Sequence, residues 1–92
     1  MAKYELRFLP EFEENLYECT SYIQNVLQNP QAAELLISEV QKAIYDRFEM
    51  PEAFEKVRSG KQRQYPYYRI YVKNYAILYV VIGNIMEVRH MF

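Results

Sequence analysis

The last third of the chain constrains the fold most, because it is rich in β-branched and aromatic residues and is interrupted twice by short polar pairs. A composition of this kind over residues 65–92 favours β-strands. Gly83-Asn84 suits a two-residue hairpin loop, since glycine accepts the positive φ that such a turn requires. Lys73-Asn74 is a weaker turn signal that depends on the tolerance of asparagine for the left-handed region. The segment therefore predicts three strands in a meander.

The two turns determine which side chains share a face of the sheet, because side chains alternate along a strand. One face, which we expect to pack on the core, carries Tyr68, Ile70, Val72, Tyr75, Ile77, Tyr79, Val81, Met86, Val88, His90 and Phe92. The other face is mixed and carries Arg69, Tyr71, Ala76, Leu78, Val80, Glu87 and Arg89. This register places Val80 opposite Glu87 and Leu78 opposite Arg89. A shift of one residue at either turn would invert part of the assignment.

The first half of the chain predicts one strand followed by a helical hairpin. Residues 4–9 alternate apolar and polar side chains, which indicates a short strand that joins the sheet in a parallel or an antiparallel sense. Apolar residues then recur at helical spacing over residues 10–28 and again over residues 30–49. Asn29-Pro30 can cap and begin the second helix, and so tight a join implies two antiparallel helices. The order β-α-α-β-β-β predicts one α+β domain over residues 1–92, with the helical hairpin on one face of a mainly antiparallel, twisted sheet.

Composition argues against several classes of protein. The chain has 92 residues, of which 51% are hydrophobic and 25% are charged, as expected for an ordinary folded domain. It lacks a signal-peptide pattern and any apolar run near the roughly 20 residues that span a bilayer, so we expect a cytoplasmic protein without membrane contact. One cysteine cannot form an internal disulfide. A single histidine and a single cysteine offer no metal-ligand set, so we expect neither a metal nor a cofactor.

Charge is divided between the two parts of the chain. Residues 1–55 hold four basic and eleven acidic side chains, a net charge of −7, whereas residues 56–92 hold seven basic side chains and one acid, a net charge of +6. Such a division favours an anionic partner for the basic part, and two solvated surfaces of opposite sign explain it equally well. A basic loop precedes the meander and leads into tyrosines that could stack on unpaired bases. Its residues are Lys56, Arg58, Lys61, Arg63, Tyr65 and Tyr67.

The mixed face offers groups that could cleave RNA without a metal. In that reaction a 2′-hydroxyl attacks the neighbouring phosphate, cations stabilise the developing charge, and a donor protonates the leaving oxygen. Arg69 and Arg89 could supply the charge, and Tyr71 lies on the same predicted face. Glu87 could instead pair with Arg89 and neutralise it. His90 falls on the predicted core face, where it would be structural, unless a bulge in the last strand turns it outward.

One motif occupies the second and third predicted strands and reads Tyr68-Arg69-Ile70-Tyr71-Val72-Lys73-Asn74-Tyr75-Ala76-Ile77-Leu78-Tyr79-Val80-Val81. Together with the helix joint at Asn29-Pro30, it resembles the RelE/ParE toxins of bacterial type II toxin-antitoxin modules, and the resemblance covers nearly the whole chain. It implies a small cytoplasmic toxin that a cognate antitoxin protein neutralises. RelE-like members cleave mRNA on the ribosome without a metal, whereas ParE-like members inhibit DNA gyrase and lack the nuclease residues.

The resemblance also implies roles for individual residues. Arg69 and Tyr71 match second-strand positions of the nucleases, Arg89 matches their C-terminal arginine, and Ala76 stands where a third-strand arginine would be. We therefore predict an mRNA endoribonuclease with Arg69, Arg89 and Tyr71 in its catalytic centre. The expected RNA contacts are Lys56, Arg58, Lys61, Arg63, Tyr65, Tyr67 and Lys73. The alternatives are a ParE-like gyrase inhibitor without chemistry of its own and a degenerate toxin that only binds its antitoxin. We expect the antitoxin to cover apolar residues of the helices or to extend a sheet edge.

Overall fold

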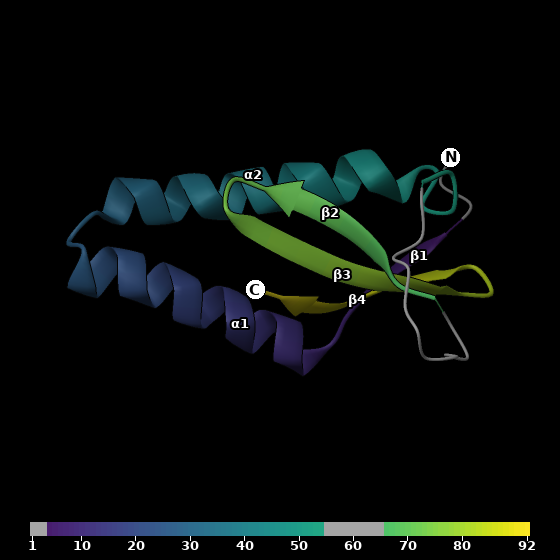
Figure 1. Ribbon diagram of the computed structural model, residues 1–92, viewed down its shortest axis with the longest axis horizontal. Helices are drawn as coiled ribbons and strands as arrows, with labels where there is room; N and C mark the ends of the chain where they lie inside the picture. The colour runs from purple at the N-terminus through teal and green to yellow at the C-terminus, as the bar shows by residue number, and fades with distance from the viewer. Residues whose placement is uncertain (1–3, 55–65) are drawn as a thin grey trace.

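A four-stranded sheet with both helices packed on one of its faces forms the body of the molecule (Figure 1). The computed structural model describes residues 4–54 and 66–92. In chain order its elements are β1 (Glu5–Phe8), α1 (Pro10–Ser21), the π-helical turn η1 (Tyr22–Val26), α2 (Pro30–Phe48), β2 (Tyr68–Val72), β3 (Tyr75–Ile82) and β4 (Ile85–Met91). The predicted α+β arrangement is therefore confirmed.

The strands lie in the order β1-β4-β3-β2 across the sheet. β2 with β3 and β3 with β4 form antiparallel hairpins, whereas β1 lies parallel to β4 at one edge, which settles the orientation that the sequence left open. A parallel neighbour needs a long crossover connection, and the helices together with β2 and β3 provide it. The first and last strands are therefore adjacent, and Arg7 lies opposite Glu87.

Both hairpins have the predicted two-residue loops, and the pairing beside each loop is the predicted one. The positive φ falls on the first loop residue in each case, with 60° at Gly83 and 53° at Lys73. The predicted left-handed conformation at Asn74 is wrong, because Lys73 adopts it instead. Lysine tolerates the conformation less well than glycine, since its Cβ crowds the following carbonyl oxygen.

A β-bulge in the pairing of β3 with β4 changes the predicted faces near the C-terminus. Leu78 lies opposite His90 and not opposite Arg89, because β4 contains one extra residue at this point. The alternation is inverted beyond the bulge, so Met91 is buried in the core and Phe92 is 66% exposed. The predicted core-face positions of His90 and Phe92 are therefore wrong, and the bulge is the physical reason.

The core lies between the two helices and the inner face of the sheet, as the helical spacing predicted. Its buried cluster comprises Phe12, Leu36, Val40, Ile44, Tyr68, Ile70, Val72, Ile77, Tyr79, Met86, Val88 and Met91. Each large apolar side chain buried in this way stabilises the fold by about 1.5–3 kcal/mol. The helices join as predicted, because Asn29 Oδ1 accepts a hydrogen bond from the N–H of Ala32 at 3.1 Å and Pro30 begins α2.

Arg47 fixes the C-terminal end of α2 to the sheet. Its Nη1 donates to the hydroxyl of Tyr79 at 3.1 Å and to the carbonyl of Arg69 at 3.3 Å, and its guanidinium lies 3.6 Å from the ring centroid of Phe54. The Tyr79 hydroxyl in turn donates to the carbonyl of Pro51 at 2.7 Å. Burial raises the pKa of Tyr79, and the hydrogen bond with Arg47 opposes that effect. The cluster also covers a carbonyl on the outer edge of β2.

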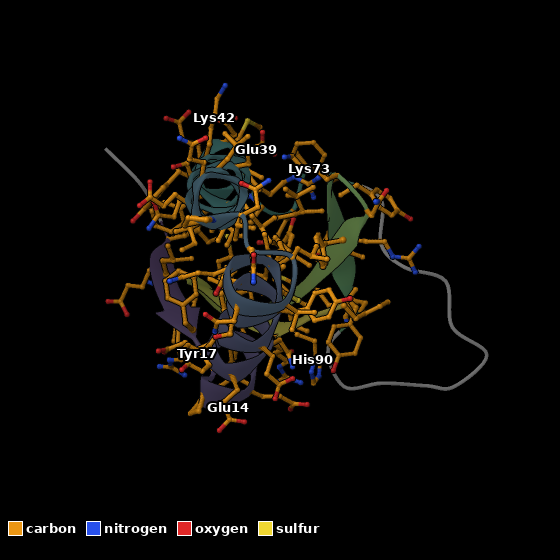
Figure 2. All side chains as sticks on the ribbon, turned by 90° about the vertical axis from the view of Figure 1, so that its left-hand side faces the viewer. Glu14, Tyr17, Glu39, Lys42, Lys73 and His90 are labelled. Atoms are coloured by element: carbon orange, nitrogen blue, oxygen red, sulfur yellow. The ribbon has the colours of Figure 1, made fainter. Side chains whose placement is uncertain are left out.

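We expect Lys73→Gly to stabilise the protein and Gly83→Ala to destabilise it, each by about 1 kcal/mol, because only glycine adopts a positive φ without a steric penalty. No described atom lies within 4 Å of a Cβ built at Gly83, so alanine there meets backbone strain and no clash. Lys73→Gly also removes an exposed ion pair with Glu39 (3.6 Å, Figure 2), which contributes little. Urea unfolding measures both variants, and a Lys73→Gly protein no more stable than its parent would contradict the account.

Candidate functional site

The face of the sheet turned away from the helices carries the charged residues that the sequence singled out. We call it the outer face, and its described members are Arg7, Arg69, Tyr71, Ala76, Leu78, Val80, Glu87, Arg89 and His90. Arg69 and Arg89 therefore lie on the same side of the sheet. Arg7 comes from β1 and is the member that the sequence analysis missed, because its partner is distant in the sequence.

Glu87 joins two arginines on the outer face. Its Oε1 accepts a hydrogen bond from Nε of Arg89 at 2.8 Å, and its Oε2 accepts one from Nη1 of Arg7 at 3.3 Å. Glu87 is only 6% exposed, and a buried carboxylate without partners would cost several kcal/mol. This arginine-glutamate trio therefore ties β1 to β4, and it engages the Nε–H of Arg89 in a structural contact.

Tyr67 holds Arg89 from a second side. The guanidinium of Arg89 lies 5.9 Å from the ring centroid of Tyr67, and the His90 ring lies 6.3 Å from the same ring. Partial burial works to lower the pKa of Arg89, but hydrogen bonds with Tyr67 and Glu87 outweigh it, so the pKa of Arg89 is raised above its ordinary value. Arg89 is therefore positively charged, with Tyr67 and Glu87 as its neighbours.

His90 lies where the outer face meets α1, and Figure 2 shows it beside that helix. Its Nδ1 is 3.3 Å from Oε1 of Glu11 in the first turn of α1. The bulge thus brings Tyr67, Arg89 and His90 into one cluster. The sequence analysis did not predict this cluster, because an inserted residue leaves no mark in an alternating pattern until the pairing partner is known.

The two arginines proposed as catalytic have different hydrogen-bond partners. Nη1 of Arg69 donates to the hydroxyl of Tyr71 at 2.6 Å, in the direction of the turn at residues 73–74. Arg89 reaches back to Glu87, in the direction of the turn at the other end of β3. The two guanidinium groups therefore have separate hydrogen-bond partners, and β3 lies between the strands that carry them.

The remaining predicted contacts are dispersed or lie outside the described residues. Lys73 pairs with Glu39 on α2. The predicted RNA contacts Lys56, Arg58, Lys61, Arg63 and Tyr65 lie outside the described residues. Within residues 4–54 and 66–92, no group of three metal-ligating side chains could hold a metal ion. None of the described helices has both the length and the apolar composition to cross a membrane.

A second surface is an apolar groove of about 290 Å³ between α1 and α2. Its lining residues are Phe8, Phe12, Glu13, Leu16, Val40, Gln41, Ile44 and Tyr45. Phe8 and Tyr45 are 38% and 59% exposed, so large apolar side chains of the groove face solvent. An apolar hollow bordered by aromatic side chains is typical of a site that receives a side chain or a short segment of another molecule.

The free edge of β1 borders this groove. Glu5 N–H donates to the carbonyl of Asn84 at 2.7 Å, and Leu9 N–H donates to the carbonyl of Val88 at 3.0 Å. In a parallel ladder every second residue hydrogen-bonds to the same neighbour, so the backbone groups of Leu6 and Phe8 face away from β4. In the described part of the chain no strand pairs with that side of β1. The groove is therefore combined with an edge that another strand could extend.

A family model described as the ParE toxin of the type II toxin-antitoxin system parDE matches residues 6–91. The chain belongs to the ParE toxin family. Membership implies a cognate antitoxin as the partner of this toxin, and it confirms the predicted resemblance to RelE/ParE toxins. No curated protein is close enough in sequence to count as a match.

Solved structures share the fold of this ParE-family toxin. A chromosomal ParDE TA system from P. aeruginosa has a TM-score of 0.78 at 10% sequence identity, over 97% of this chain and 94% of that chain. The YoeB dimer from Staphylococcus aureus has a TM-score of 0.50 at 22% identity, over 97% of this chain and 94% of that chain. Because both identities are low, these likenesses establish the arrangement of helices and strands and nothing about the target.

We expect Glu87→Gln to destabilise the toxin by about 2 kcal/mol, because it leaves two arginines without their carboxylate. The effect stays below that of a fully buried pair, since the side chains of Arg7 and Arg89 are 53% and 28% exposed. Glu5→Gln, at an exposed position of β1, is the matched control and should change stability by less than about 0.5 kcal/mol. Denaturant unfolding measures both, and equal stability of Glu87→Gln and its parent would argue against a structural trio.

Proposed function

We propose that this toxin acts by binding its target, as an inhibitor of DNA gyrase of the ParE kind, and does not cut RNA. The arginine-glutamate trio is the observation that carries the proposal. Arg89, which would stabilise charge on a scissile phosphate, already gives its Nε–H to the buried carboxylate of Glu87. The match to the ParE family over residues 6–91 supports the same choice.

The geometry of the outer face supports a binding mechanism for a second reason. Catalysis by charge stabilisation requires donors that converge to about 3 Å around one developing charge. Arg69 and Arg89 donate to different partners: Arg69 donates to the hydroxyl of Tyr71, which accepts, and Arg89 donates to the carboxylate of Glu87. Ala76, on the strand between them, offers no donor and is only 8% exposed. In the described hydrogen bonds the residues predicted for RNA cleavage therefore share no partner, which supports a binding mechanism.

A ribosome-dependent mRNA endoribonuclease is the second candidate, and the cluster of Tyr67, Arg89 and His90 favours it. A histidine can transfer protons near neutral pH, and a tyrosine ring can stack on an unpaired base. In this candidate Arg69, Arg89 and Tyr71 keep the catalytic roles that the sequence predicted. A toxin that has lost both activities and retains antitoxin binding is the remaining alternative.

Two assays with purified toxin separate these candidates. We expect the toxin to inhibit supercoiling of relaxed plasmid DNA by gyrase, to release this inhibition when antitoxin is added, and to leave mRNA on programmed ribosomes intact. Cuts at fixed codon positions that disappear in Arg89→Ala and His90→Ala would establish the endoribonuclease instead. A folded toxin without either activity would also contradict the proposal and would favour the degenerate alternative.

We further propose that the antitoxin occupies the groove between α1 and α2 and adds a strand to the edge of β1. Strand addition supplies main-chain hydrogen bonds, and an adjoining pocket supplies specificity. The other edge of the sheet is less suited, because Arg47 already donates to the outward carbonyl of Arg69 on β2. The edge of β1 has the exposed ring of Phe8 beside it and leads directly into the groove.

We expect Tyr45→Asp to weaken the complex with the antitoxin by at least tenfold, because it places a charge in the apolar groove. Tyr71→Asp on the outer face is the matched control, since Tyr71 is 69% exposed and lies on the opposite side of the sheet. Both variants should keep the melting temperature of the parent to within a few degrees. Titration of each toxin with antitoxin measures the affinity, and equal affinities for the two variants would exclude the groove.

A further inference from the structure

The end of the helical hairpin projects beyond the sheet, at the left of Figure 1 and toward the viewer in Figure 2. We call η1 and the turn that follows it, residues 22–29, the helix tip. Three of its apolar side chains are exposed, with 54% at Tyr22, 63% at Val26 and 57% at Leu27. No charged side chain occurs from Cys19 to Ala33, although 25% of the whole chain is charged. A protrusion that is both apolar and free of charge favours contact with another molecule.

The backbone of the helix tip departs from a regular helix. Leu27 N–H donates to the carbonyl of Tyr22 at 3.1 Å, five residues back, which is the π-helical pattern. Gln28 has a φ of 50° although it is not glycine, and this conformation costs about 1–2 kcal/mol. Asn29 N–H then donates to the carbonyl of Ile23 at 3.0 Å and closes the turn. Such departures from regular geometry concentrate at functional positions.

Packing within the molecule does not account for the exposed side chains of the helix tip. Ile23 packs against the core cluster, and Ala33 and Leu36 of α2 are buried, so these residues hold the two helices together. Tyr22, Val26 and Leu27 each expose more than half of their surface. Polar residues at the three exposed positions would leave the core of the fold unchanged, so stability alone gives no reason for apolar ones.

We propose that the helix tip is the surface by which the toxin binds its target protein, with Tyr22, Val26 and Leu27 entering an uncharged apolar pocket of that protein. This inference rests on the binding mechanism proposed above and adds the contact surface to it. Nucleic acid does not fit, because the phosphate backbone binds to cations and the helix tip has none. The counter-surface that matches a charge-free protrusion is one that is itself free of unpaired charge.

A second copy of the chain does not fit the helix tip either. Three partly exposed side chains remove about 100 Å² each, so two copies meeting tip to tip would bury roughly 600 Å². A stable symmetric interface needs about 1,200 Å² or more. A concave pocket can surround a convex tip on all sides, and an aromatic anchor such as Tyr22 binds most strongly in such a pocket. The helix tip is also separate from the groove proposed for the antitoxin, whose lining lies nearer the other end of α1 and along α2.

The double variant Val26→Gln with Leu27→Gln tests the proposal in the full-length toxin. We expect it to need at least tenfold more protein for half-maximal inhibition of gyrase supercoiling, with unchanged antitoxin affinity and unchanged melting temperature. Met50→Gln is the matched control, because Met50 is 65% exposed beyond the other end of α2 and should leave inhibition unchanged. A photo-reactive amino acid at position 26 should cross-link to a gyrase subunit, and the same group at position 50 should not.

Inhibition by the double variant equal to that of the parent would overturn the proposal. Weakened antitoxin binding with full inhibition would also overturn it, because the helix tip would then serve the antitoxin. If the parent toxin leaves gyrase active, the proposed function fails, but the proposal for the helix tip can still be tested. The test is then whether each variant arrests cell growth when it is induced. Relief of arrest by the double variant, and not by Met50→Gln, would keep the helix tip as the contact to another target, whereas unchanged arrest would overturn it.

Discussion

The ion pairs of Glu87 determine how the first strand joins the sheet and what the outer face can do. β1 is short and lies at an edge, so its backbone hydrogen bonds alone fix it weakly. Arg7 and Arg89 meet the same buried carboxylate from two parallel strands. The contact adds charge-assisted hydrogen bonds to the ladder, and it occupies the Nε–H of Arg89. The ion pairs of Glu87 therefore both stabilise the attachment of β1 and occupy a donor of Arg89.

The toxin has three distinct surfaces. The outer face is held together by its own ion pairs and hydrogen bonds, the groove with the edge of β1 can receive an extended partner, and the helix tip carries apolar side chains away from both. The two apolar surfaces lie at different places on the same pair of helices. A toxin built in this way can be recognised by its antitoxin and by its target without one residue having to serve both.

The sequence determines much of the fold because its signals are local. Asn29 caps α2 as predicted, and alternation gives both hairpin registers up to the bulge. The bulge could be named only as an alternative, because one extra residue in β4 leaves composition unchanged, and with it His90 lies on the outer face. Arg7 escaped notice because its partner is decided by the parallel pairing of β1 with β4, which no local pattern encodes. The separate partners of Arg69 and Arg89 were also beyond sequence reasoning, since a shared face does not fix the direction of a long side chain.

A double-mutant cycle between Glu87 and Arg89 tests most directly whether that arginine is committed to the sheet. The free energies of unfolding of Glu87→Gln, Arg89→Gln and the double variant are compared with that of the parent. The account predicts a coupling energy of at least about 1 kcal/mol, because each residue gives up its partner when the other is replaced. Additive effects, with a coupling near zero, would mean that the Arg89 guanidinium is available to a ligand and would contradict a toxin that acts by binding alone.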